Sequence, residues 1–260
     1  MPDSDPMPEI VTVPCLRDNY AFLLHDPGSG ATALIDAPEA GPIASELAQR
    51  GWRLTDILIT HHHGDHVDGV AALREASGAQ VWGAAADAGR LPPLDHAVAE
   101  GDTVTVGGLS GQVLEVPGHT VGHVAFHFPA AGAVFTADSL MALGCGRLFE
   151  GSAEQMWQSL RKLAALPPET RVCSGHEYTA ANARFALTVE PDNEALRDRA
   201  RAIDGARSDG RATVPSTLGE ELATNPFLRA AEPGIAARLD MAGAAPVDVF
   251  ARIRGLKDGF

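Results

Sequence analysis

THHHGDH, the stretch Thr60–His66, places five potential metal ligands within seven consecutive positions. The run Asp56–Ile59 in front of it is typical of a short buried strand, and Val67–Ser77 behind it has the pattern of a helix that ends at Gly78. The ligands therefore follow the end of a strand, where α/β proteins tend to place their chemistry. A solvated loop does not usually hold four histidines in six positions, so the stretch predicts a metal site.

Three later segments repeat this design, each with an apolar run, one or two small or turn residues, and then one metal ligand. The runs Val113–Val116, Ala133–Thr136 and Arg171–Ser174 lead in this way to His119, Asp138 and His176. Strand ends that point the same way would gather seven ligands at one edge: His61, His63, Asp65, His66, His119, Asp138 and His176. Imidazole and carboxylate suit zinc, iron or manganese better than calcium. Seven ligands exceed the needs of one zinc ion and suit two ions if one carboxylate bridges them.

The rest of the chain divides into an α/β part and a helical tail. Further β-like runs lie at Ile10–Val13, Tyr20–His25, Ala31–Asp36, Gln80–Trp82, Thr103–Val106 and His123–Phe128, and helical patterns at Pro38–Gln49 and Ala153–Ala165. From Thr179 onward no β signal remains, and helical patterns occupy Thr179–Gly205 (split near Pro191), Val214–Glu221 and Gly234–Lys257. We therefore expect an α/β domain at residues 1–178 and an all-helical domain at residues 179–260.

Composition bounds the class of protein. The chain has 260 residues, of which 45% are hydrophobic and 21% charged, the balance of an ordinary globular protein. Its net charge of -14 argues against nucleic acid and anionic membranes as partners. Met1–Glu9 lacks the basic start and apolar core of a secretory signal, and no run approaches the length of a membrane span. The cysteines Cys15, Cys145 and Cys173 form no CxxC pair, so we expect a reducing cytoplasm. We also expect a monomer.

The pattern His61-x-His63-x-Asp65-His66, followed by a distant His, Asp and His, resembles the metallo-β-lactamase superfamily. Within it, the chain is most similar to the glyoxalase II, or hydroxyacylglutathione hydrolase, family. Five segments carry this closer match: Asp18-Asn19-Tyr20, Gly144–Gly151, Gly175–Tyr178, Asn225–Arg229 and Arg254-x-x-Lys257-Asp258. The resemblance implies an αββα sandwich, with two β-sheets back to back and helices outside, followed by a helical substrate-binding domain.

The resemblance also implies the role of each ligand. His61, His63 and His119 would hold the first metal, Asp65, His66 and His176 the second, and Asp138 would bridge the two. Asp65 and Asp138 would be the catalytic residues that orient or bridge a metal-bound hydroxide. Zinc is the expected metal at both positions, with iron or manganese as alternatives. His62 would point away from the metals, and His123 would support the ligands from behind.

The substrate of the family is S-D-lactoylglutathione, which is cleaved to D-lactate and glutathione in methylglyoxal detoxification. The residues that match the family's glutathione contacts are Arg147, Tyr178, Arg254 and Lys257. Residues 252–258 hold three bases and one acid, a local charge of +2 in an acidic protein, as an anionic small substrate requires. A thioester suits such a site, because its thiol of pKa about 8.5 leaves as thiolate without a strong general acid.

The chain departs from the family pattern at four positions. Phe149 stands where the family has a second glutathione-contacting tyrosine, so one hydroxyl contact is lost. Arg147 stands where lysine is more common, and its guanidinium can bind a carboxylate bidentately. Ala137 and Ser139 flank Asp138 where the family prefers glycine and threonine.

Other functions compatible with the metal ligands stay open. A persulfide dioxygenase of the same superfamily would use one iron ion and oxygen, but it lacks a helical tail with a basic end. A lactonase or a lactamase would leave Arg254 and Lys257 without a purpose. A purely structural metal protein would bind metal without turning over any thioester.

Overall fold

The computed structural model describes residues 7–260, which form two compact units. The first unit holds described residues 7–115 with 122–135, and the second holds 116–121 with 136–260. Part of the N-terminal segment that we expect not to be a secretory signal, residues 1–6, lies outside the described residues. Among the described residues, no helix is long and apolar enough to cross a membrane.

The first unit is built on two sheets. One sheet has the strand order β1-β2-β3-β4-β5-β6, antiparallel from β1 to β3 and parallel from β3 to β6. Its strands are β1 (Glu9–Cys15), β2 (Asn19–Asp26), β3 (Ala31–Ile35), β4 (Arg53–Leu58), β5 (Gln80–Ala84) and β6 (His96–Val98). The part of the other sheet that lies mainly in the first unit is antiparallel and runs β7 (Thr103–Val106), β8 (Leu109–Glu115), β9 (Val124–Phe128) and β10 (Ala133–Ala137). The last two residues of β10 belong to the second unit.

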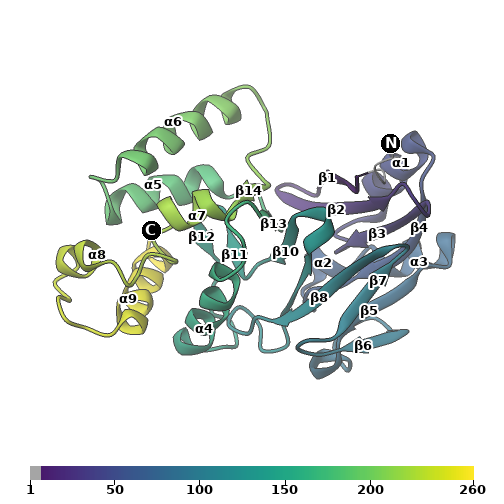
Figure 1. Ribbon diagram of the computed structural model, residues 1–260, viewed down its shortest axis with the longest axis horizontal. Helices are drawn as coiled ribbons and strands as arrows, with labels where there is room; N and C mark the ends of the chain where they lie inside the picture. The colour runs from purple at the N-terminus through teal and green to yellow at the C-terminus, as the bar shows by residue number, and fades with distance from the viewer. Residues whose placement is uncertain (1–6) are drawn as a thin grey trace, which may run out of the picture. The chain divides into compact units, whose positions relative to one another are not determined.

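The two sheets pack face to face, and helices cover the other face of the first sheet (Figure 1). The Phe22 ring on β2 lies 5.8 Å from the Phe135 ring on β10, measured between centroids. Behind β3 and β4, helices α1 (Ala40–Arg50) and α3 (Val70–Ser77) complete a continuous apolar core. Burial on both faces explains why all eight residues of β2 are buried. The back-to-back sheets implied by the family resemblance are confirmed.

The expected helix Val67–Ser77 is wrong at its start. The structure has two helices, α2 (Gly64–Val67) and α3, so helical geometry begins inside the ligand stretch. At the break, the Ala37 N–H donates to the His66 carbonyl and the Gly69 N–H donates to the Ala37 carbonyl, both at 2.8 Å. A Cβ at Gly69 would approach the backbone near Ala37 to 3.0 Å, so the close docking requires glycine. This docking splits the helix and anchors the histidines.

The second unit contains the remaining helices and short strands. Helix α4 (Ala153–Ala164) begins at a capping box formed by Ser152 and Gln155 and buries Met156, Trp157, Leu160 and Leu163, as its periodicity predicts. The other elements are β11 (Leu140–Met141), β12 (Gly144–Cys145), β13 (Arg171–Ser174), α5 (Thr179–Val189), α6 (Glu194–Ser208), β14 (Ser216–Thr217), α7 (Leu218–Thr224), α8 (Pro233–Arg238) and α9 (Pro246–Asp258). Short 3-10 turns lie in the first unit at Ala85–Asp87 and Pro129–Ala131.

The tail is mainly helical as expected, with two departures, one of which is a break at residues 239–245 that divides the expected segment Gly234–Lys257 into α8 and α9. The split near Pro191 is confirmed, because α5 ends at Val189 and the Asn193 side chain caps the start of α6. Inside the expected helical segment Val214–Glu221, Ser216 and Thr217 instead form β14, which pairs antiparallel with β13. This short strand satisfies backbone groups that would otherwise lie open at a sheet edge.

Candidate metal centre

The histidine loop gathers its ligands within the first unit. The His61 Nε2 and His63 Nδ1 atoms lie 3.2 Å apart. The His66 Nε2 atom lies 3.9 Å from Asp65 Oδ2, and the rings of His61 and His66 have centroids 4.2 Å apart. His61 and His66 are buried, whereas His63 and Asp65 are half-buried. The four predicted ligands of this loop are therefore brought together.

Asp36 organises this loop, although sequence reasoning did not single it out. Its Oδ1 accepts the Thr60 N–H, and its Oδ2 accepts the Thr60 hydroxyl and the His66 Nδ1–H, each at 2.8 Å. The Thr60 hydroxyl lies in turn 3.0 Å from His61 Nδ1. These bonds turn Nε2 of both histidines away from Asp36 and fix their tautomers. Asp36 directly follows β3, and this strand-end position was the signal that could have identified it.

Two further neighbours hold the loop in place. The Asn19 amide donates to Asp65 Oδ2 and to the Asp65 carbonyl, both at 3.1 Å. Asn19 belongs to the segment Asp18-Asn19-Tyr20, which carried part of the family resemblance. In the structure, its side chain fixes the position of Asp65. The His123 ring stacks on the His61 ring with centroids 4.6 Å apart, as a supporting residue would.

His62 contributes to a different cluster. Its Nδ1 lies 3.3 Å from Asp87 Oδ2, and its Nε2 lies 3.4 Å from Arg90 Nη1. Arg90 also forms two hydrogen bonds to the other oxygen of Asp87, which is buried. His62 therefore contacts side chains outside the predicted ligand set.

The second unit brings its three predicted ligands together around one oxygen atom. Asp138 Oδ2 lies 3.4 Å from His119 Nε2 and 3.3 Å from His176 Nε2. All three side chains are buried. The His119 Nδ1 lies 2.8 Å from the Arg147 carbonyl, to which it donates, so that its Nε2 faces Asp138. Ala137 has φ 41°, a left-handed conformation that explains why glycine is the easier residue at this position.

These spacings fit metal ligands. Two atoms bound to one tetrahedral zinc at about 2.0 to 2.1 Å lie about 3.3 to 3.4 Å apart. The His61–His63 pair and both Asp138 pairs lie between 3.2 and 3.4 Å. The Asp138 Oδ2 atom, at 3.4 and 3.3 Å from the two histidine nitrogens, fits either one ion shared by the three side chains or a bridge between two ions. The donor set therefore suits one or two borderline divalent ions.

The four predicted glutathione contacts all lie in the second unit, in different environments. Tyr178 is 40% exposed and stacks on the His176 ring with centroids 4.6 Å apart. Arg147 is exposed. Arg254 is buried, and its guanidinium donates to the Cys145 carbonyl at 2.8 Å and to Asp258 at 3.0 Å. Phe149, which replaces the second tyrosine of the family, is exposed and lies 5.2 Å from the His119 ring.

Lys257 belongs to a local group of cations. Its Nζ donates to the Ala181 carbonyl at 3.4 Å and lies over the rings of Phe185 and Phe260. Burial and repulsion from Arg254, Arg184 and Arg147 lower the pKa of Lys257 to about 8. A group of cations that repel one another in this way favours the binding of an anion. Arg184 on α5 was not predicted as part of this group.

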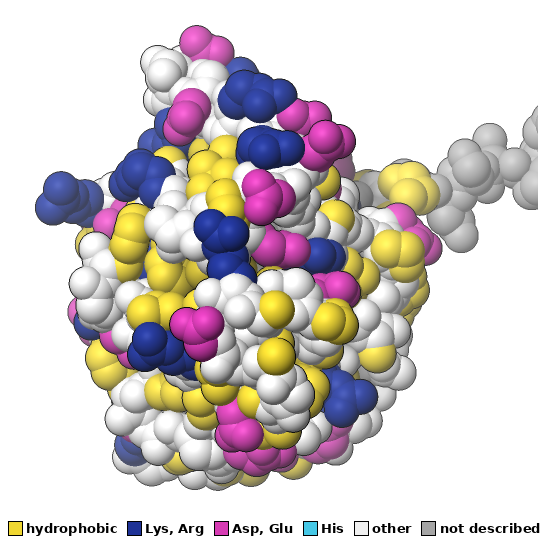
Figure 2. Space-filling view, turned by 90° about the vertical axis from the view of Figure 1, so that its left-hand side faces the viewer, with side chains coloured by type: hydrophobic (Ala, Val, Ile, Leu, Met, Phe, Trp, Pro, Cys, Tyr) yellow, Lys and Arg dark blue, Asp and Glu magenta, His cyan; other side chains and the backbone are white. Residues whose placement is uncertain are grey.

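The surface of the helical tail carries charges of both signs. Figure 2 shows the face that includes the helical tail, where basic and acidic side chains alternate over the surface. Such a mixed surface fits a small anionic ligand bound at one point better than an extended polyanion.

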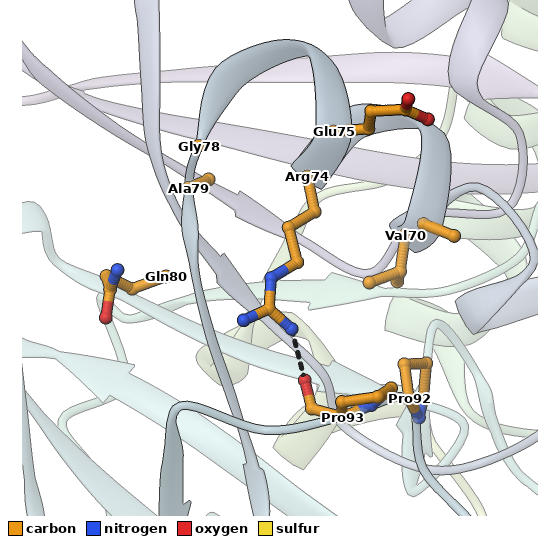
Figure 3. Close-up of a pocket in the computed structure, with 9 residues that line it drawn as sticks. Val70, Arg74, Glu75, Gly78, Ala79, Gln80, Pro92 and Pro93 are labelled. Carbon is orange, nitrogen blue, oxygen red and sulfur yellow. Dashed lines mark hydrogen bonds between the residues drawn. The ribbon is translucent and has the colours of Figure 1, made fainter.

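A surface hollow of about 450 Å³ lies in the first unit, between α3 and the segment Pro92–Pro93 (Figure 3). The Arg74 side chain crosses it and donates to the Pro93 carbonyl at 2.7 Å. Its other terminal nitrogen donates to Asp95. Its lining contains none of the predicted metal ligands and none of the predicted glutathione contacts.

Two family models match adjoining parts of the chain. One family model, described as the metallo-beta-lactamase superfamily, matches residues 16–176, and another, described as the hydroxyacylglutathione hydrolase C-terminus, matches residues 177–260. A hydroxyacylglutathione hydrolase from Jannaschia sp. (strain CCS1) is 71% identical over 253 residues, which cover 97% of the chain and 99% of that protein.

Two solved structures are similar in fold. ETHE1 from Myxococcus xanthus matches with a TM-score of 0.66 at 27% identity, over 96% of the chain and 90% of that protein. TTHA1623 in a di-iron-bound form matches with a TM-score of 0.61 at 29% identity, over 85% of the chain and 100% of that protein.

Proposed function

The chain belongs to the metallo-beta-lactamase superfamily and, within it, to the hydroxyacylglutathione hydrolases, and we propose that it hydrolyses S-D-lactoylglutathione to D-lactate and glutathione. The observation that carries this proposal is the match of the helical tail to the C-terminal model of these hydrolases. The tail also holds Arg254 and Lys257, the basic pair that an anionic thioester requires. In the cell, this activity would serve methylglyoxal detoxification.

The metal site of the proposal combines the two ligand sets. We assign His61, His63 and His119 to one metal ion, Asp65, His66 and His176 to a second, and Asp138 to both. When bound, two zinc ions would activate water at neutral pH and polarise the thioester carbonyl. Support comes from the spacing of the donor atoms and from the di-iron form of TTHA1623. Iron and manganese suit the same donors.

The side chains around the ligands have distinct roles. Asp65, held by Asn19, would orient the attacking water, and Asp138 would serve as the ligand common to both ions. The leaving group needs little help, because a thiol of pKa about 8.5 departs as thiolate. The free cysteines Cys145 and Cys173 are buried and have raised pKa values, so a cysteine nucleophile is not part of the proposal.

The substrate site of the proposal lies in the second unit. Arg147 and Lys257 would bind the glutathione carboxylates, and the Tyr178 hydroxyl would donate a further hydrogen bond. Arg254 would complete the site by adding positive charge from its buried position. Phe149 offers an apolar surface in place of a hydroxyl, so we expect glutathione affinity to depend more strongly on the cations.

Three further points belong to the proposal. We assign residues 1–178 to a catalytic domain and residues 179–260 to a substrate-binding domain, a division that differs from that of the compact units. We also propose a monomer, which sedimentation would test. A cytoplasmic location is supported by the three buried free cysteines, which fit a reducing compartment.

The deciding experiment combines metal analysis with turnover. The purified protein is expected to contain about two divalent ions per chain, and to release free thiol from S-D-lactoylglutathione with a stoichiometric yield of D-lactate. Loss of the reaction after chelation and its return with zinc would tie turnover to the metals. Oxygen consumption with glutathione persulfide, in place of thiol release from the thioester, would identify a dioxygenase and refute the proposal.

A further inference from the structure

A short hairpin, Leu140–Cys145, joins the predicted bridging ligand Asp138 to the predicted substrate residue Arg147. Its strands β11 and β12 have only two residues each, with Leu140 paired to Cys145 and Met141 to Gly144. A hairpin of this length is not stable by itself in water. At its tip, Leu143 has φ 56°, a left-handed conformation that is unfavourable for a residue with a side chain. Something outside the hairpin must therefore hold it.

Four side chains of the helical tail do so, and we call them the hairpin clamp: Asn182, Glu221, Asn225 and Arg254. The Asn225 amide donates to the Met141 and Gly144 carbonyls at 3.1 and 3.0 Å. The Asn182 amide donates to the Ala142 carbonyl at 3.0 Å.

The other two members complete the clamp. Glu221 accepts the Leu143 N–H, and Arg254 donates to the Cys145 carbonyl, both at 2.8 Å. Each backbone position from 141 to 145 thus has one hydrogen bond to a tail side chain.

The clamp is rigid because it is buried and internally connected. Its four side chains are at most 6% exposed. Glu221 also accepts from the Asn225 amide at 3.1 Å and from the Ser216 hydroxyl at 2.6 Å, and it is paired with Arg199. Since water cannot replace these bonds easily, a hairpin group that lost its partner would stay unsatisfied. The Leu143 side chain packs between α5 and α6 and adds an apolar anchor.

The chain leaving the hairpin touches two predicted metal ligands. The Gly146 N–H donates to the Ser139 carbonyl at 3.3 Å, which ties it to the residue after Asp138. A Cβ at Gly146 would lie 2.0 Å from the Asp138 carbonyl oxygen and 2.9 Å from His119 Nδ1. The next residue, Arg147, accepts the His119 hydrogen bond on its carbonyl. A shift of the hairpin would therefore displace Asp138 and release His119.

We propose that the hairpin clamp positions the bridging carboxylate and His119 for metal, and Arg147 for substrate, so that Asn182 and Asn225 are positioning residues of the reaction. The expected change in kcat rests on the proposed function. The expected change in zinc affinity rests only on the geometry of the predicted ligands. It also gives a role to Asn225 in the segment Asn225–Arg229, which carried the family resemblance without an assigned purpose. The helical tail then serves the metal centre as well as the substrate.

The test compares Asn182→Ala and Asn225→Ala with the wild type. Metal retention is measured against a graded series of chelator concentrations, with zinc as the loaded metal, and needs no turnover. We expect both variants to lose about 10-fold or more in zinc affinity, as changes behind metal ligands typically do. Deuterium exchange of the Leu143 and Gly146 amides should accelerate. The kcat for S-D-lactoylglutathione should fall further than in a control variant that loses a similar amount of stability.

Asn193→Ala provides the matched control. Asn193 is also an asparagine of the second unit that caps α6 and donates to the Ala223 carbonyl at 3.0 Å. Its loss should lower the stability of the protein and leave zinc affinity unchanged. If Asn182→Ala and Asn225→Ala retained zinc and kcat as well as Asn193→Ala does, the clamp would have only a general structural role. Should Asn225→Ala fail to fold, Asn182→Ala, which removes one bond, decides alone.

The outcomes separate this inference from the proposed function. A wild type that binds two metals but does not cleave the thioester would refute the function and leave the metal readout of the clamp intact. A wild type that cleaves the thioester, with clamp variants that match Asn193→Ala in zinc affinity and amide exchange, would refute the clamp alone.

Discussion

Asp36→Asn is the sharpest single change that the first unit offers, because it preserves the shape of the side chain while it removes the negative charge and turns one acceptor into a donor. The Asp36 carboxylate accepts three hydrogen bonds at 2.8 Å, two from Thr60 and one from His66 Nδ1. An asparagine that keeps the bond from the Thr60 N–H must turn its NH₂ group toward His66. His66 Nδ1 would then have to accept, and the ring proton would move to Nε2, the nitrogen assigned to the metal.

The magnitude follows from these contacts. Asp36 is 2% exposed, so replacing its charge-assisted bonds should lower the free energy of unfolding of the metal-free protein by about 1 to 3 kcal/mol. Mispositioning a metal-binding histidine through its second nitrogen typically costs 10- to 100-fold in metal affinity, or about 1.4 to 2.7 kcal/mol. Asp36→Ala should cost more in stability, because it leaves three buried donors unsatisfied.

Urea unfolding of the metal-stripped protein and chelator competition of the loaded protein measure the two effects separately. Asp56→Asn is the control, because this buried carboxylate of the same unit accepts from Trp82 and Thr55 instead. The control should lose stability and keep its metals. If Asp36→Asn bound both metals as tightly as Asp56→Asn does, His66 would not be a ligand oriented through Asp36, and the reasoning would be wrong.

Three other changes test separate parts of the proposal. Asp138→Ala removes the oxygen that lies within 3.4 Å of both His119 and His176, so we expect loss of at least one metal and of most turnover; full metal content with full activity would refute the bridge. Lys257 has its pKa lowered to about 8, so its charge is present below that pH and lost above it. Binding of S-methylglutathione, an uncleavable analogue, should therefore weaken between about pH 7 and pH 9, and Lys257→Arg, which stays charged, should remove this dependence; an unchanged pH profile would exclude Lys257 as the titrating contact. Burial raises the pKa of Cys145 to about 11, so iodoacetamide at pH 8 should leave the native protein unmodified and active. Rapid alkylation, detected by mass spectrometry, would contradict this burial.

The sequence by itself determined the features that local pattern controls. Metal ligands such as His61 and His119 follow apolar runs at short spacings, because strands end where polar loops begin. The helices α4, α5 and α6 were predicted from periodicity and from the proline near position 191. The two-sheet arrangement came from the family resemblance, since alternation along one strand does not reveal which sheet it joins.

Only the tertiary structure decided the contacts between distant segments. Asp36 lies 30 positions from His66 and Asn225 lies 84 from Met141, and no local pattern connects such pairs. The same holds for the break between α2 and α3, which depends on docking against Ala37, and for Arg254, which is buried and donates to the Cys145 carbonyl 109 positions away. A ligand needs only the right side chain at a strand end, whereas its orientation depends on hydrogen bonds that exist only once the chain has folded.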